Sequence, residues 1–422
     1  MSASRRITTT VGVGVALALA VSGCSTKAGG STGGAGKDGL KTDFGVTDSE
    51  ITLGALTDAS GPFKVGGVLV THGNELWAKQ VNQAGGICGR QIKLDIRDTS
   101  YKADTAIPAY DDLQTKSAGL IQIIGSAVFA ALKQKMIANQ MMGSSPTIAS
   151  ENLDSDVMVG VTTTFDVEAI NGLAFLQQQG KLADGAKIGA IYLQNEAGQN
   201  AFAGVQAYAK KHNIEVVGAP ASPTDTDMTA TVTKFKSQGV NLVYIAMPPA
   251  ATASTAVQMK GQGLAVPLVG FNSAFQPSML SDQQVIDALQ SNFYFIPAAH
   301  VWNSDVEAVA KLREQWAAAG IQDAPAQSVI TGYLSGLAWG AILKQACDDG
   351  DMTRKGLVEA RKKVTSLETG LSGVLDFSDP GAPPTRETLV AQVDAQAPGG
   401  LKEISKLTVS KEAKEYKTPY QK

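Results

Sequence analysis

Histidine and cysteine are rare in this chain of 422 residues, which contains three of each. The histidines, His72, His212 and His300, lie far apart, and no HExxH, GxSxG or Walker motif accompanies them. No two cysteines form a CxxC pair, so the sequence offers no recognisable metal-ligand cluster. We therefore expect neither an enzyme nor a protein with a metal or another cofactor.

Charged residues are also sparse, at 18% of the chain, and the formal net charge is −3. Cleavage after residue 23 would remove Arg5 and Arg6 and change the net charge from −3 to about −5. A negative balance argues against nucleic acid or an anionic membrane surface as the binding partner. No apolar run reaches the ~20 residues that a transmembrane helix needs.

The chain begins with the parts of a secretory signal. Arg5 and Arg6 form a basic head, and Val11 to Val21 is a short apolar run. Val21-Ser22-Gly23-Cys24 follows and resembles the bacterial lipobox. The resemblance implies cleavage after residue 23 and lipidation of Cys24, which would anchor the protein to the outer face of the cytoplasmic membrane. An ordinary signal peptide that happens to contain a cysteine is the alternative.

Residues 24–43 are rich in Gly, Ser, Thr and Lys, so we expect a lipidated cysteine followed by a flexible tether. A GxGxxG match at residues 34–39 follows no predicted strand and is not interpreted as a dinucleotide site. Beyond Cys24, Cys88 and Cys347 remain as an even pair. Because export leads to an oxidising compartment, we predict a Cys88–Cys347 disulfide; two separate buried thiols are the alternative.

From Glu50 onward, short apolar runs alternate with amphipathic stretches. We expect strands at 51–56, 92–96, 120–124, 188–193, 214–217, 242–246 and 267–270, with helices between them. Such alternation is typical of parallel sheets covered by helices on both faces, here in two similar α/β lobes. After Ile296 we expect three helices (305–319, 328–345 and 353–363), a strand-like piece at 371–377, and edge strands at 388–393 and 407–409.

Six short segments, in this order, resemble the branched-chain amino-acid binding proteins of ABC importers. They are Leu56–Pro62 with its SGP loop, Asn82–Arg90 with its GGI motif, Leu94–Asp98, Leu120–Gly125, Ser144–Pro146 and Gly370–Phe377. The resemblance covers about residues 48–393. It implies a type I periplasmic-binding fold, an α/β protein with two doubly wound parallel-sheet lobes joined by three crossovers.

The resemblance also implies domain limits and a function. Lobe one would be 44–165 plus 298–367, lobe two 166–297 plus 368–410, and 411–422 a C-terminal tail. The protein, a monomer, would capture a small organic solute between the closing lobes and deliver it to a membrane permease. The solute would be an amino acid, or a small carboxylate, aromatic acid or amide. The alternative is a ligand-sensing lipoprotein that signals to a membrane receptor.

Ligands bind open parallel sheets at the carboxyl ends of the strands, where helix N-termini favour anions. Loops at these positions supply the candidate ligand-binding residues: Asp58, Phe63, Ser126, Phe129, Ala149, Ser150, Asn195, Met247, Phe271 and Asn272.

Some of these residues depart from the family pattern. Phe129 stands where the family has a serine, and we expect Ser126 to supply that hydroxyl; Ala149-Ser150 keeps the hydroxyl of an Ala-Thr step. Asn272 stands where an acidic residue would pair with the ligand's ammonium group, and an unpaired buried ammonium is costly. Asp58 is either a substitute for that acid or a turn residue.

The aromatic candidates, together with Met247, indicate an apolar ligand body, whereas Ser126, Ser150 and helix N–H groups indicate a carboxylate or another acceptor head. Phe129 is equally compatible with the core, and Asn195 and Asn272 are compatible with turns.

Overall fold

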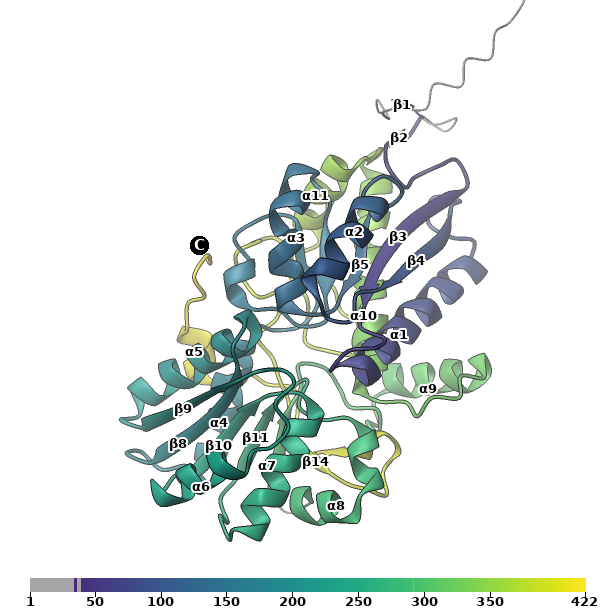
Figure 1. Ribbon diagram of the computed structural model, residues 1–422. Coiled ribbons are helices and arrows are strands. Elements are labelled where there is room, and N and C mark those ends of the chain that lie inside the picture. The colour runs from purple at the N-terminus through teal and green to yellow at the C-terminus, as the bar shows by residue number, and fades with distance from the viewer. Residues whose placement is uncertain (1–33, 36–38, 291) are drawn as a thin grey trace, which may run out of the picture. The chain divides into compact units, whose positions relative to one another are not determined.

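Two mainly parallel sheets organise the chain (Figure 1). The computed structural model describes residues 34–35, 39–290 and 292–422. The first sheet has the strand order β4-β3-β5-β6-β7, and all its neighbouring strands are parallel. Its strands are β3 (Glu50–Thr57), β4 (Gln91–Asp98), β5 (Gly119–Ile123), β6 (Gly143–Ser145) and β7 (Met158–Gly160). Every residue of β5 is buried, as expected for a central strand between two helical layers.

Helices from two distant parts of the chain pack on this sheet or against one another. Three come from between its strands, and three come from the later part of the chain (Figure 1). They are α1 (Lys64–Gln83), α2 (Ala103–Leu113), α3 (Ser126–Ala138), α9 (Glu307–Ala319), α10 (Gln327–Asp348) and α11 (Arg354–Lys363). We call this sheet and its six helices the first lobe.

Helices α1 and α10 cross at glycines. A Cβ atom on Gly332 would lie 1.9 Å from the carbonyl oxygen of Val70, and one on Gly73 would lie 2.2 Å from that of Val329. The two backbones therefore touch directly. This contact brings the first turns of both helices to the same end of the first lobe.

The second sheet has seven strands in the order β15-β14-β12-β11-β10-β8-β9. Its parallel strands are β8 (Lys187–Leu193), β9 (Glu215–Ala221), β10 (Leu242–Ala246), β11 (Leu268–Phe271) and β12 (Phe293–Ile296); β14 (Ala391–Val393) and β15 (Leu401–Glu403) join antiparallel at one edge. With α4 (Phe165–Gln178), α5 (Glu196–Lys211), α6 (Thr229–Ser237), α7 (Pro249–Gly261) and α8 (Gln283–Leu289), it forms the second lobe.

The chain passes between the two sheets three times: after β7, after β12, and between α11 and β14. The predicted fold, two α/β lobes with parallel sheets joined by three crossovers, is therefore confirmed.

Some local expectations differ from the structure. Residues 371–377 form isolated bridges and no strand. The expected lobe limits place this segment in the second lobe, whereas Leu371, Leu375 and Phe377 are buried in the hydrophobic cluster of the first. The second edge strand is Leu401–Glu403, whereas at 407–409 only Thr408 makes an isolated bridge. Antiparallel edge strands are positioned by pairing with distant residues, which periodicity alone does not reveal.

The two ends of the described chain are anchored to the lobes. Within the predicted tether, β2 (Lys41–Thr42) pairs with β1 (Gly34–Ala35) and with β13 (Asp351–Met352). The predicted tail 411–422 contains α12 (Lys411–Glu415), whose Ala413 is fully buried. The predicted signal peptide, Cys24 and residues 25–33 lie outside the described residues.

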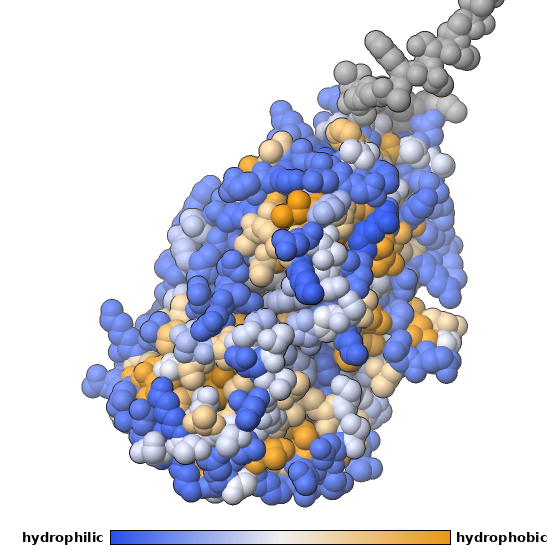
Figure 2. Space-filling model, in the orientation of Figure 1, coloured by the Kyte–Doolittle hydropathy of each residue, from blue (hydrophilic) through white to orange (hydrophobic). Residues whose placement is uncertain are grey.

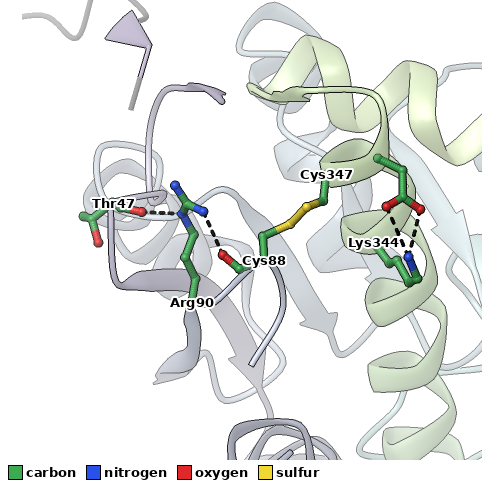
Figure 3. The surroundings of a disulfide bond; sticks show 6 residues. Thr47, Cys88, Arg90, Lys344 and Cys347 are labelled. Atoms are coloured by element: carbon green, nitrogen blue, oxygen red, sulfur yellow. Dashed lines mark hydrogen bonds and ion pairs between the residues drawn. A yellow bond between two sulfur atoms is a disulfide. The ribbon is translucent and has the colours of Figure 1, made fainter. Parts of the chain in front are cut away.

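The Cys88–Cys347 disulfide is confirmed (Figure 3). Cys88 follows α1, Cys347 lies in the last turn of α10, and their Cα atoms are 6.3 Å apart. Arg90 holds the Cys88 turn, because its guanidinium donates to the carbonyl oxygens of Thr47 (2.6 Å) and Cys88 (3.0 Å). Both sulfurs belong to the first lobe, so the bond does not link the two lobes.

Hydrophilic residues occupy much of the face shown in Figure 2, and hydrophobic residues appear there in separate groups. Among the described residues, no helix is both long and apolar enough to cross a membrane.

Candidate functional site

A cavity of about 430 Å³ is lined by residues of both lobes. The first lobe contributes loops that follow its strands and the first turns of α1, α3 and α10. The second lobe contributes the first turns of α4, α5 and α7 and the loop after β11. The main wall residues are Gly61–Gly67, Tyr101, Ile124–Ser126, Ser145–Thr147, Thr162, Phe165, Leu193, Ala197, Pro249, Phe271–Ser273, Gln276, Met279, Gln327, Ser328 and Thr331.

Much of the wall is apolar. Phe165 and Phe271 lie together with ring centroids 5.6 Å apart, and Phe63 lies 4.9 Å from the ring of Tyr101. Aliphatic side chains complete this surface: Val65, Val70, Ile124, Leu193, Met279 and Val285. A cavity of this size with such walls suits a small organic molecule with an apolar body.

Polar groups also line the cavity, among them Ser145, Thr147, Thr162, Gln276, Gln327 and Thr331. Ser126 is the first residue of α3, and α1 begins beside the cavity at Lys64; neither helix has a side-chain cap on its first N–H groups. Uncapped helix N-termini favour a negatively charged or acceptor group. Lys64, which is exposed, is a cation at this wall.

Asp58 lies outside the cavity wall and shapes the loop that carries Phe63. Its buried carboxylate accepts hydrogen bonds from the N–H groups of Gly61 (2.5 Å), Phe63 (2.9 Å) and Ser60 (3.3 Å). Because three backbone N–H groups already donate to this carboxylate, it stabilises the loop. Asp58 is therefore placed as a turn residue would be.

Ser150 belongs to a buried network between the lobes. Its hydroxyl donates to Asp166 Oδ2 (2.6 Å) and accepts from Asn200 Nδ2 (2.8 Å), and the hydroxyl of Tyr416 also donates to Asp166 Oδ2 (3.1 Å). Asp166 itself is fully buried in the first turn of α4. The network therefore joins a loop of the first lobe, two helices of the second and the C-terminal segment at a crossover, and Ser150 is not among the wall residues.

Three further candidates that do not line the cavity are core residues. Phe129 packs in the hydrophobic cluster beside β3 and β5, and Ala149 and Met247 pack in the cluster of the second lobe. Each is at most 1% exposed. Phe129 points into the core because its position on α3 faces the sheet, which corresponds to the core alternative.

Asn272 lines the cavity with an acidic group directly behind it. Its backbone N–H and its Nδ2 donate to the two carboxylate oxygens of Glu168, at 2.7 Å and 2.5 Å. Glu168 is fully buried, and this burial raises its pKa well above the ordinary value. Glu168 thus supplies an acidic group near position 272, but Asn272 lies between its carboxyl group and the cavity.

Asn195 lies next to the cavity as the N-cap of α5, and its Nδ2 donates to the hydroxyl of Tyr101 at 3.1 Å.

Tyr101 is a wall residue that sequence reasoning missed, as are Phe165 and Gln276. Tyr101 precedes α2 and Phe165 begins α4, each at the end of an extended segment. This position is the sequence signal from which both could have been predicted. Of the ten candidates, the structure brings Phe63, Ser126, Phe271 and Asn272 together on the wall.

Across the described ranges, no group of three or more His, Cys, Asp and Glu side chains is arranged to hold a metal ion.

Known proteins share this fold. A family model described as "Periplasmic binding protein" matches residues 50–398. A fatty acid ABC transporter substrate-binding protein from Thermomonospora curvata is 30% identical, with a TM-score of 0.89 over 92% of this chain and 99% of that chain. A branched chain amino acid ABC transporter protein from Thermus thermophilus with bound valine is 16% identical, with a TM-score of 0.77 over 87% of this chain and 99% of that chain.

Among curated proteins, the chain is similar to Leu/Ile/Val-binding protein homolog 3 of Brucella melitensis, with 24% identity over 200 residues. That match covers 46% of this chain and 54% of the relative, so the chain spans about half the length of the curated relative it matches.

Proposed function

The chain belongs to the periplasmic binding protein family, and on that premise we propose that it captures a small organic acid outside the cytoplasm for an ABC importer. It is a binding protein and not an enzyme, as its family membership shows. Delivery to a membrane permease would follow when the two lobes enclose the ligand, because a ligand that contacts both lobes favours their closed arrangement.

The character of the cavity supports an acid with an apolar body. Aromatic and aliphatic side chains form its walls, and helix N-termini and Lys64 supply positive potential for a carboxylate. The relative from Thermomonospora curvata, at 30% identity, is a fatty acid substrate-binding protein.

The acidic groups near the cavity are poorly placed to bind an ammonium group. Asp58 is occupied by backbone N–H groups, and Glu168 lies behind Asn272. The one carboxylate of the wall, Asp282, is exposed and caps α8 through the N–H of Gln284 (2.8 Å). A zwitterionic amino acid would bury its ammonium group without a counter-charge, which is costly. Among the described residues of the wall, no buried carboxylate is available to an ammonium group, and this is the observation that carries the proposal.

Thermal melting of the protein lacking residues 1–24 against a ligand panel tests it. The panel pairs decanoate, octanoate and benzoate with their amides and adds leucine and valine. At 100 times its dissociation constant a ligand stabilises the folded state by about 2.7 kcal/mol, a readable shift. We expect shifts with acids and none with leucine or valine. Shifts with leucine or valine alone would contradict the acid proposal.

We further propose that lipid at Cys24 anchors the protein to the cell envelope. The Val-Ser-Gly-Cys sequence after a short apolar run supports this. Metabolic labelling with an alkyne fatty acid should mark the wild type, and Cys24→Ala should abolish both the label and membrane fractionation. Equal labelling of both proteins would contradict the proposal.

A further inference from the structure

The loop that carries Tyr101 has an unusual backbone. Ser100 and Tyr101, the second and third residues after β4, have φ angles of 52° and 59°. Residues other than glycine rarely adopt such angles, because they are energetically unfavourable. Two consecutive ones require strong local support. The conformation therefore points to a role for the side chain that it presents.

Asp98 supplies that support. Its carboxylate accepts hydrogen bonds from the hydroxyl of Ser60 (2.7 Å) and from the N–H groups of Ser100 (2.8 Å) and Ala59 (2.9 Å). The partners lie in the loops after β3 and β4, so this carboxylate holds the two loops together. The bend at Ser100 and Tyr101 is thus part of the first lobe itself.

The Tyr101 ring is wedged into the first lobe. It lies against Phe63, and a Cβ atom at Gly125 would lie 2.4 Å from its ring. Gly125 has a φ of 105° and precedes α3, so only glycine both adopts this backbone and leaves room for the ring. The first lobe alone therefore positions the ring on the cavity wall.

The hydroxyl of Tyr101 reaches the second lobe. It accepts the hydrogen bond from Asn195 Nδ2 (3.1 Å), and Asn195 Oδ1 in turn accepts from the N–H of Gly198 (3.2 Å). The cap bond to Gly198 fixes the amide with its nitrogen toward Tyr101. Burial raises the pKa of Tyr101 to about 12, so this hydroxyl keeps its proton at neutral pH.

We propose that the Tyr101–Asn195 hydrogen bond is a latch that holds the two lobes closed over the ligand. The ring belongs to the first lobe in any arrangement, whereas the hydrogen bond forms only when the lobes approach each other. The latch therefore slows ligand release. That this closure serves solute capture rests on the proposed function.

Two substitutions remove the latch and keep its surroundings. Tyr101→Phe retains the ring, and Asn195→Ser retains an N-cap for α5 while losing the donor. A net hydrogen bond of about 0.5–1.5 kcal/mol corresponds to about a 2- to 10-fold faster dissociation of decanoate, measured by stopped flow, for either variant. The double variant should be no faster than the single ones, because both remove the same bond. Tyr192→Phe, whose ring stacks on Phe202 within the second lobe, is the control and should leave the rate unchanged.

A ligand-free measurement separates the latch from the ligand class. Dyes at Lys79→Cys and Lys234→Cys, on exposed sites of the two lobes, report the distance between lobes by single-molecule energy transfer. Tyr101→Phe and Asn195→Ser should each shift the population toward longer distances. If decanoate fails to bind the wild type, the proposed function fails on its ligand while this shift still tests the latch. An unchanged distribution in both variants, or additive effects on dissociation, would overturn the latch.

Discussion

The carboxyl group of Glu168 is surrounded by protein on all sides and is bound by two N–H donors of one residue, Asn272. No cation is among the causes that set its pKa, so burial dominates and favours the protonated form. The neighbouring Tyr244 is equally buried, and its pKa is raised by burial and by the nearby Glu168. Asn272 thus faces the cavity with a buried acid behind it whose pKa is raised.

This burial predicts how stability depends on pH. The unfolded chain releases the Glu168 proton near its ordinary pKa of 4.5, whereas the folded chain retains it to higher pH. The free energy of unfolding therefore falls as pH rises from that value through the raised pKa. Relative to Glu168→Gln, the wild type should lose about 1.4 kcal/mol per pH unit in this window.

Urea unfolding between about pH 4 and pH 9 measures this difference. Glu314→Gln, on the exposed side of α9, is the matched control and should follow the wild type. Parallel curves for the wild type and Glu168→Gln would show that the Glu168 carboxyl titrates alike in both states.

Sequence reasoning reached some of these residues and missed others for a physical reason. Phe63 and Phe271 were found because each lies at or just beyond the carboxyl end of a parallel strand, where a cavity forms. Glu168 was missed because an acid in the first turn of a helix is expected to favour the helix dipole at the surface. Its burial depends on a loop 104 residues later, which no local pattern contains.

At the scale of elements, the glycine contact between α1 and α10 determines where the first lobe presents its helix ends. The first turn of α1 carries Lys64 to Gly67 and that of α10 carries Gln327 and Ser328, all on the cavity wall. Separation of these helices would widen the wall at that end.

We expect Gly332→Ala to destabilise the protein by about 1–3 kcal/mol, because its Cβ would lie 1.9 Å from the Val70 carbonyl oxygen in a packed contact. Gly340→Ala in the same helix is the control: its Cβ would meet Trp77 at an ordinary 3.4 Å, and alanine favours helix by up to about 1 kcal/mol. Chemical unfolding of both variants measures the contrast. Equal effects would mean that α10 can shift freely along α1.

The alternating pattern of the sequence predicted seven of the parallel strands, β3, β4, β5, β8, β9, β10 and β11, because buried parallel strands read as short apolar runs. It did not indicate β6, β7 or β12, which have only three or four residues each. It did not predict β15, where Leu401-Lys402-Glu403 pairs antiparallel with β14 at the sheet edge. Nor did it indicate that Lys41–Thr42 pairs with Asp351–Met352, since these two-residue strands are too short to show a period.

At the scale of the whole molecule, the parallel strands of the second lobe lie between the two cysteines in the sequence, although the disulfide itself belongs to the first lobe. The two cysteines are 259 residues apart, and the strands β8 to β12 all lie between them. The cavity wall lies near the first turns of α1 and α10, whereas the disulfide lies at their last turns. A helix of 20 residues such as α1 separates the two by about 30 Å.

Replacement of both cysteines by serine should therefore lower stability and spare ligand binding. We expect a loss of about 2–4 kcal/mol in the free energy of unfolding, because the unfolded chain gains the entropy of an open loop. The decanoate dissociation constant should stay within about 2-fold of the wild type. A large change in affinity with little change in stability would contradict this separation.

The order in which the first lobe is assembled has a consequence for export. Its sheet is complete by residue 160, yet α10, which packs against α1 and β5, begins only at residue 327. A chain that emerges from the N-terminus first therefore leaves the face of this sheet beside α1 only partly covered until most of its length has crossed the membrane. Contacts this distant in sequence form slowly, so the unfinished chain remains both translocation-competent and prone to aggregation. The second lobe, whose parallel strands are contiguous, can fold while the first still waits for its last helices.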